Sequence, residues 1–166
     1  LTKSLAKMTV IDNMLLGAAE QKGESLRNAL LPSRWQKQEK EILEKAEDLL
    51  ERFKLSHMRD EYAATLSGGQ RKLLEMARAL MSEPKLILLD EPMAGVNPVL
   101  VESLLVHIEN LRDEGVSVLF IEHDMDAIMG ISDWIVVLAE GQVIAEGTPS
   151  DVSKNPAVID AYLGSA

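Results

Sequence analysis

The sequence predicts an α/β protein with a largely parallel sheet and an added helical region, and three observations lead to this prediction. Short apolar runs without alternation occupy 86–90, 117–121 and 134–138, a pattern typical of parallel strands that are buried on both faces. Segments of helical character separate these runs, and strands that alternate with helices favour a parallel sheet. Upstream of the first run, nearly every pattern is helical. We therefore divide the chain into a helical region, 1–82, and an α/β region, 83–166.

Two helices are predicted early in the helical region. Residues 9–19 form a short helix for which Thr9 is a suitable N-cap. Residues 35–54 form the clearest helix of the chain, because apolar residues recur there at three- and four-residue spacing. On this helix Glu41 and Lys45 have the spacing of a favourable i,i+4 ion pair.

The α/β region contains further helices and a returning strand. Helices are predicted at 98–112, which has a proline in its first turn, and at 125–131. Gly141 marks a turn, after which 143–147 pairs back as a short strand. The segment 151–163 again has helical character.

Composition and charge exclude several classes of protein. The chain has 166 residues, of which 46% are hydrophobic and 27% charged, as in ordinary globular proteins. Its formal net charge of -10 does not favour nucleic acid or anionic lipid as partners. There is no cysteine, so disulfides and thiol catalysis are excluded. The sequence has no apolar stretch long enough to predict a membrane span.

The segment Ser67-Gly68-Gly69-Gln70 opens a predicted helix at 67–81. Ser67 followed three residues later by Gln70 fits a capping box. The two glycines leave the first backbone amides bare at the positive end of the helix, which predicts an anion site, most naturally for phosphate. The alternative interpretation is a capped helix with a flexible lead-in and no ligand.

Two adjacent carboxylates, Asp90 and Glu91, follow the apolar run at 86–90. Ligands of open α/β sheets bind at the carboxyl ends of the strands. Asp90 can hold Mg²⁺ directly or through water, as in nucleoside-triphosphatases. Glu91 can lie over the γ-phosphate and polarise an attacking water. The alternative is a strand that simply ends in a polar turn.

A histidine, His123, follows the apolar run at 117–121. It belongs to the same edge of the predicted sheet as Asp90 and Glu91. From there it can donate a hydrogen bond to a γ-phosphate or orient the attacking water. We interpret the other two histidines, His57 and His107, as structural.

The order and spacing of these motifs resemble the C-terminal half of an ABC ATPase domain. LSGGQ (66–70) is similar to the family signature, and LILLDEP (86–92) to the Walker B strand with its catalytic glutamate. MAGVNP (93–98) resembles the D-loop, and His123 the switch histidine. The resemblance covers essentially the whole chain. It implies a partial P-loop NTPase-type fold, with a largely parallel sheet and a helical subdomain.

The resemblance also implies a division of roles, because the signature of one subunit in an ABC dimer faces the ATP held by the other. ATP would be contacted in trans by the signature residues Ser67, Gly68, Gly69 and Gln70. Asp90, Glu91 and His123 would serve the ATP of their own subunit, with Asp90 holding Mg²⁺ through water. The implied partners are a second ABC ATPase subunit and transmembrane permease subunits. The implied location is peripheral, at the cytoplasmic face of the inner or plasma membrane.

One family motif, the Walker A loop G-x-x-x-x-G-K-[ST], does not occur in the sequence, which has no Gly-Lys dipeptide and begins with Leu1. The family places this loop upstream of every motif quoted above. The lysine and amides of that loop supply most of the contacts to the β- and γ-phosphates. We therefore expect the chain alone to have little or no ATPase activity. We also expect an exposed apolar face of its sheet, and self-association that buries this face.

Within the family, four segments resemble the ATPase subunits of branched-chain amino-acid importers: MTVIDNMLLGA, LLDEPMAGVNP, IEHDMDAIMGISDWIVVL and GQVIAEGTPSDVSKNPAVIDAYLG. The chain departs from that subfamily in its unaltered LSGGQ, and from other ABC proteins in carrying Asn97 in the D-loop. Two alternatives stay open: a non-catalytic interaction fragment, and a soluble ABC protein that acts on DNA or ribosomes. An enzyme that uses a metal alone is disfavoured, because Asp90, Glu91 and His123 make a poor closed metal site without phosphate oxygens.

Overall fold

The computed structural model describes residues 4–19, 21 and 35–163. The chain forms two compact units, Leu1–Phe120 and Ile121–Ala166, and each is described by itself. The predicted division after residue 82 marks the point where helical segments give way to strands, and as a domain boundary it stays a prediction. In the described part, no helix combines the length and apolar character needed to cross a bilayer.

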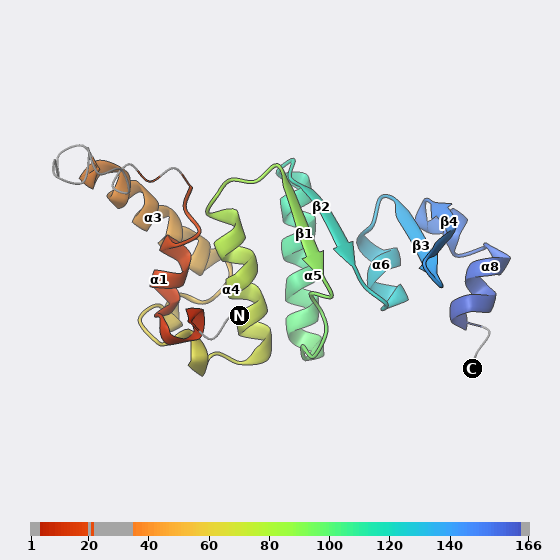
Figure 1. Cartoon of the computed structure of the whole chain (residues 1–166), viewed down its shortest axis with the longest axis horizontal. Coiled ribbons are helices and arrows are strands. Elements are labelled where there is room, and N and C mark those ends of the chain that lie inside the picture. Colours follow the sequence, from red (N-terminus) through yellow and green to blue (C-terminus); the bar gives the residue numbers. More distant parts are fainter. Residues whose placement is uncertain (1–3, 20, 22–34, 164–166) are drawn as a thin grey trace. The chain divides into compact units, whose positions relative to one another are not determined.

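Three α-helices pack against one another at the start of the first unit (Figure 1). They are α1 (Val10–Leu15), α3 (Gln36–Arg52) and α4 (Gly68–Leu80). A short 3₁₀ turn, η1 (Leu5–Lys7), precedes α1, and two more, η4 (Ser56–Met58) and η5 (Ala63–Thr65), connect α3 to α4. The predicted cap of α1 is confirmed, since the Thr9 hydroxyl accepts a hydrogen bond from the amide of Asp12 at 3.1 Å.

The core of this helical part is aliphatic, as expected for a chain with few aromatic residues. Besides one aromatic residue, Phe53, the members that are at most 1% exposed are Val10, Met14, Ala46, Leu50, Leu55, Ala63, Leu74 and Ala77. A polar side chain, Asn13, is buried among them, and its amide donates to the carbonyls of Leu5 and Thr9. This burial is tolerated because the amide keeps its hydrogen bonds.

The predicted ion pair between Glu41 and Lys45 is wrong. The half-buried Lys45 ammonium instead lies 2.6 Å from Glu83 and donates to the carbonyl of Met81. It therefore joins α3 to the end of α4, where orphan carbonyls at the negative end of a helix attract a cation. Glu41 pairs with Lys37, one turn earlier on the exposed face of α3.

Two strands and a helix complete the first unit: β1 (Leu86–Asp90), α5 (Pro98–Asp113) and β2 (Ser117–Ile121). β1 and β2 are neighbours in one sheet and run in the same direction (Figure 1). The amide of Ser117 donates to the carbonyl of Lys85 at 3.0 Å, so the starts of the two strands lie side by side. This is the parallel β-α-β arrangement that the apolar runs predict.

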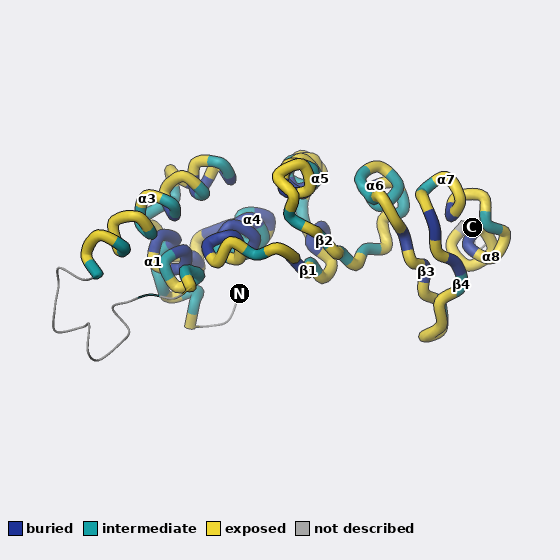
Figure 2. The backbone as a smooth tube through the Cα atoms, turned by 90° about the horizontal axis from the view of Figure 1, so that it is seen from above, coloured by how far each residue is buried: buried dark blue, intermediate teal, exposed yellow. Residues whose placement is uncertain are grey.

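The prediction that these strands are buried on both faces is wrong for the described structure. In β1, Ile87 is 4% exposed, whereas its neighbours Leu86 and Leu88 are 53% and 67% exposed. Leu119 in β2 is 58% exposed, and Figure 2 shows exposed positions along both strands. Because successive side chains of a strand point to opposite faces, one face of the sheet is packed and the other is open. This open apolar face agrees with the expectation of an exposed face.

The second unit contains the helix α6 (Met125–Ile131) and a hairpin of two strands, β3 (Ile135–Ala139) and β4 (Gln142–Gly147). Its last elements are the short helical turns α7 (Pro149–Val152), α8 (Pro156–Val158) and η6 (Ile159–Leu163). α6, β3 and β4 match their predicted positions to within a residue, and α8 and η6 lie within the predicted helical segment 151–163, whereas α7 begins two residues before it.

The hairpin is antiparallel, with Ala139 opposite Gln142, so Glu140 and Gly141 alone form its loop. Both loop residues have positive φ, 51° and 77°, as the two-residue turns that match strand twist require. The inner face of the hairpin packs with α7 and α8 into a second small core, which consists of Ile135, Val137, Ala145, Val152 and Val158.

Candidate functional site

The first part of the site is the N-terminus of α4, where the predicted capping box is present. The amide of Gln70 donates to the hydroxyl of Ser67 at 3.2 Å, and the amide of Ser67 donates to the side-chain oxygen of Gln70 at 2.9 Å. Ser67 and Gly68 are exposed. The hydroxyl of Ser67 still has its own O–H to donate. Together with the free amides of the first turn, it offers donors to an anion at the positive end of a 13-residue helix.

Gly69 has a packing role that its place in the motif does not reveal. A Cβ at this position would collide with the Cδ1 atom of Leu100 and would lie 3.2 Å from the Cγ1 atom of Val96. Gly68 has more space around it than Gly69, since a Cβ at position 68 would be 3.8 Å from the carbonyl oxygen of Gly95. The first turn of α4 thus lies directly against the segment that leads into α5.

The second part of the site is the end of β1. Asp90 is the last residue of the strand, Glu91 follows it, and both are exposed. Glu91 has a backbone φ of 44°, in the left-handed region that non-glycine residues rarely adopt. Such strain gathers at functional sites, where the surrounding structure holds it in place. Here it marks a turn of the chain directly after the end of β1.

Two donors hold the turn after the strand. The carbonyl of Glu91 accepts a hydrogen bond from the amide of Ala94 at 3.2 Å and another from the ammonium of Lys72 at 3.1 Å. The amide of Val96 then donates to the carbonyl of Met93 at 3.1 Å. Lys72 belongs to α4, so the helix that carries the signature is bonded to the main chain of the predicted catalytic residue.

A small pocket of about 190 Å³ lies where α4, β1 and α5 meet. Lys72, Met76, Ile87, Asp90 and Leu104 are among the residues that line it. The pocket brings Asp90 next to the helix that begins with the signature. A second pocket of about 370 Å³ shares Glu75 and Ala79 of α4 with it and is otherwise lined by Leu5, Leu16, Gly17, Arg78 and Ser82.

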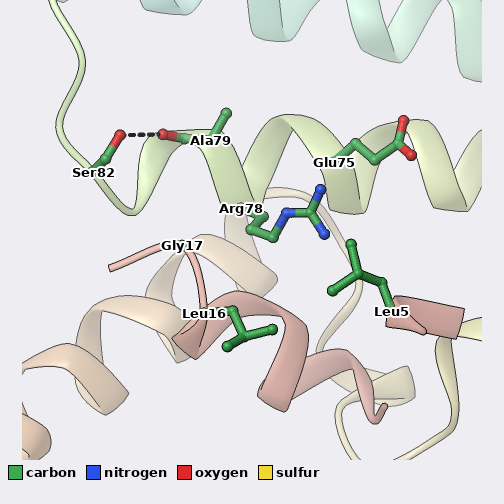
Figure 3. A pocket seen from close by; sticks show the side chains of 7 residues that line it. All are labelled: Leu5, Leu16, Gly17, Glu75, Arg78, Ala79 and Ser82. Atoms are coloured by element: carbon green, nitrogen blue, oxygen red, sulfur yellow. Dashed lines mark hydrogen bonds between the residues drawn. The ribbon is translucent and has the colours of Figure 1, made fainter. Parts of the chain in front are cut away.

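The larger pocket is shown in Figure 3. Arg78 of α4 reaches toward the α1 side, near Leu16 and Gly17 (Figure 3). Its guanidinium donates to the side-chain oxygen of the buried Asn13 at 3.4 Å. A Cβ at Gly17 would be only 2.8 Å from the Cγ atom of Arg78, so glycine is needed for this close approach. We assign these residues to helix packing and not to the phosphate chemistry.

The third part of the predicted site lies in the second unit. His123 follows β2, and its side chain is 74% exposed. Its amide donates to the carboxylate of Glu122 at 3.3 Å, and its Nδ1 atom lies 3.8 Å from that carboxylate. The Glu122 side chain is only 1% exposed. The next residue, Asp124, caps α6 through the amide of Ala127. The placement of His123 beside Asp90 and Glu91 stays a prediction.

The donor set was tested for a metal site made by the protein alone. Among the described residues, no group of three His, Asp or Glu side chains could hold a metal ion. Asp90 offers one carboxylate at an exposed strand end. This suits Mg²⁺, which keeps several waters and is usually bound through one or two carboxylates together with substrate phosphates.

Two family models match the chain. The model described as ABC transporter matches residues 3–94, which is more than half of the chain. The chain belongs to the ABC transporter family. A second model, described as branched-chain amino acid ATP-binding cassette transporter, matches residues 142–166 of this ABC chain.

Individual relatives support the assignment. The ABC chain is 49% identical over 160 residues to a probable branched-chain amino acid transport ATP-binding protein, LivG, of Archaeoglobus fulgidus. It is 40% identical over 162 residues to the high-affinity branched-chain amino acid transport ATP-binding protein BraF of Pseudomonas aeruginosa. Each alignment covers 96% of this chain, but only 62% and 64% of the relative. The chain thus spans less than two thirds of the length of these relatives.

Solved structures show the same fold. A crystal structure of the ADP conformation of an ATP-binding cassette of an ABC transporter superposes with a TM-score of 0.79 at 42% identity. A nucleotide-free ATP-binding cassette superposes equally well, at 41% identity. These matches cover 99% and 98% of this chain, and 66% and 65% of the solved chains. The predicted fold class, a partial ABC cassette of the P-loop NTPase type, is confirmed.

Sequence reasoning missed two residues of the candidate site. Lys72 lies within the predicted helix, but its contact with Glu91 depends on how α4 packs against the end of β1. Glu122 stands next to His123, and only the structure shows that its side chain is buried. Both are charged residues within six positions of a motif, and no other feature of the sequence indicates a role for them.

Proposed function

We propose that this chain is the signature-bearing part of the ATPase subunit of a branched-chain amino-acid importer. The observation that carries the proposal is the agreement between the two ends of the chain. Residues 3–94 match the general ABC model, and residues 142–166 match a model specific to branched-chain amino acid transporters. ATP hydrolysis by such a subunit would drive uptake through transmembrane permease subunits. The subunit would lie peripherally, at the cytoplasmic face of the membrane.

The exposed groups at the end of β1 support a hydrolytic role. Asp90 would hold Mg²⁺ through water, and the metal would neutralise charge on the phosphates. Glu91 would polarise the attacking water from its exposed position in the turn directly after the strand. His123 would orient the same water or the γ-phosphate. These roles need a nucleotide held by a Walker A loop, and the sequence does not contain that motif.

The N-terminus of α4 supports a role in a dimer. Ser67, Gly68 and Gly69 would present an O–H group and backbone amides to the γ-phosphate bound by a second ABC ATPase subunit. Gln70 would act mainly by fixing the turn, because its side chain is already engaged in the capping box.

The proposal is tested in a completed cassette, in which the chain is joined to the segment that precedes the matched region in the Archaeoglobus relative. In this protein Glu91→Gln should reduce ATP hydrolysis by about 100-fold or more, the range typical of general-base groups. Equilibrium binding of Mg·ATP should persist, because the side chain is needed for the water and not for the phosphates. The matched control is Glu102→Gln, which removes the same charge from an exposed position of α5.

Hydrolysis by the Glu91→Gln cassette at the rate of the control would contradict the assignment of Glu91. A cassette that neither binds nor hydrolyses ATP would favour the interaction-fragment alternative. The transport claim has a separate test in cells that lack the complete subunit. They should lose uptake of radiolabelled leucine while uptake of an unrelated amino acid continues.

A further inference from the structure

One face of α4 joins the signature to the turn that holds the predicted catalytic glutamate. Gly69, Lys72 and Met76 are spaced by three and four residues, so they lie on the same side of the helix. Gly69 contacts Val96 and Leu100. Lys72 bonds to Glu91, and Met76 lines the pocket beside β1. This side of the helix therefore packs on the segment 87–104 within one compact unit.

The bond of Lys72 is directed at the main chain of Glu91 and not at its carboxylate. The ammonium donates to the Glu91 carbonyl at 3.1 Å, and Lys72 itself is half-buried. A hydrogen bond with a charged donor is stronger than a neutral one. The residue that it holds is the one with a φ of 44°. A strained backbone keeps its conformation only when its neighbours determine it, and Lys72 is such a neighbour.

We propose that Lys72 is a positioning residue for Glu91. By anchoring the Glu91 carbonyl, it keeps the peptide in the left-handed conformation that directs the carboxylate at the attacking water. Because Lys72 lies one helical turn after Gly68, it also makes the position of Glu91 depend on the position of the signature. This inference rests on the proposed function for its catalytic consequence, but the anchoring itself does not require nucleotide.

The anchoring is tested first in the 166-residue chain by amide hydrogen exchange. The amides of Ala94 and Val96 report on the turn directly, since they donate to the carbonyls of Glu91 and Met93. Lys72→Met keeps the aliphatic stem and removes the donor, so exchange of both amides should become faster. Lys40→Met, an equal change on the exposed face of α3, should leave them unchanged. Equal exchange in the two variants would overturn the proposal.

The catalytic consequence is tested in the completed cassette. Lys72→Met should lower kcat for ATP hydrolysis by about ten- to 100-fold, as a small misplacement of a reacting group does. The KM for ATP should stay within about two-fold, because the phosphate contacts do not change. Lys72→Arg, which keeps a charged donor, should recover a large part of the rate. A rise in KM at constant kcat, or an unchanged rate, would overturn the positioning role.

The two measurements separate this inference from the proposed function. If the completed cassette with the natural sequence does not hydrolyse ATP, the proposed function fails, and hydrogen exchange alone decides whether Lys72 anchors the turn. If the cassette is active and the Lys72→Met variant is as fast as the Lys40→Met control, the proposed function stands and the inference fails.

Discussion

His107 illustrates at the residue scale how a titratable group can serve packing alone. It is 6% exposed, and its ring stacks on Phe53 with centroids 4.2 Å apart and planes 25° apart. Among the described residues, neither ring nitrogen has a hydrogen-bond partner. Burial lowers the pKa of His107, and the charges of Arg52 and Lys54 lower this pKa further. The histidine therefore packs α5 against the end of α3 in its neutral form, as the sequence analysis expected of a structural residue.

The lowered pKa of His107 makes stability depend on pH. The unfolded chain takes up a proton near the ordinary value of about 6.5, whereas the folded chain does so only at lower pH. Unfolding should therefore become easier as pH falls from about 6.5 toward the lower pKa of the folded state. In His107→Phe, which keeps the stacking, this part of the pH dependence should vanish. Urea unfolding at pH 7 and pH 5 checks the prediction, and an equal loss of stability in both proteins would contradict it.

At the scale of elements, the described helices and strands could be predicted with small errors at their ends, because local signals determine them. Periodic apolar residues made α3 predictable, and the serine and glutamine of a capping box made the start of α4 predictable. The partner of Lys45 could not be predicted, because Glu83 is 38 residues away. Nor could the contact between Lys72 and Glu91, which depends on tertiary packing. The prediction that the strands are buried on both faces was wrong, because an apolar run does not show which other segments pack against each face.

The hairpin between β3 and β4 provides a prediction for a single element. Glu140 has a φ of 51° in a two-residue turn, and asparagine occupies this conformation more readily than glutamate. Glu140→Asn should therefore raise the free energy of unfolding by up to about 1 kcal/mol. Chemical denaturation measures the change. Gly141→Ala in the same turn should have the opposite effect, and a destabilised Glu140→Asn variant would show that the glutamate side chain makes a contact of its own.

At the scale of the whole molecule, each unit has exposed apolar side chains along its strands. Those on the strands that are more than 50% exposed are Leu86, Leu88, Leu119, Ile121, Leu138 and Val143. Apolar surface of this kind marks an interaction site or an aggregation hazard. Such exposure is predicted from the absence of a Walker A motif in the sequence.

Self-association of the chain should follow from this surface. Sedimentation velocity should show a concentration-dependent increase in mass, and Leu88→Lys should weaken the association, because it places a charge where apolar surface would be buried. Leu16→Lys is the control, since Leu16 is similarly exposed, at 56% against 67%, but lies on α1. If Leu88→Lys associates as strongly as the control, the β1 face is not the surface that is buried.

The most direct test of the account is calorimetric titration of Mg·ATP into the 166-residue chain and into the completed cassette. We propose that Asp90, Glu91 and His123 belong to a nucleotide site whose phosphate-binding loop is not among the motifs of this sequence. Binding by the completed cassette and none by the chain alone is expected from this proposal. Micromolar binding by the chain alone would contradict it, because the described residues would then contain a phosphate site other than the one proposed here.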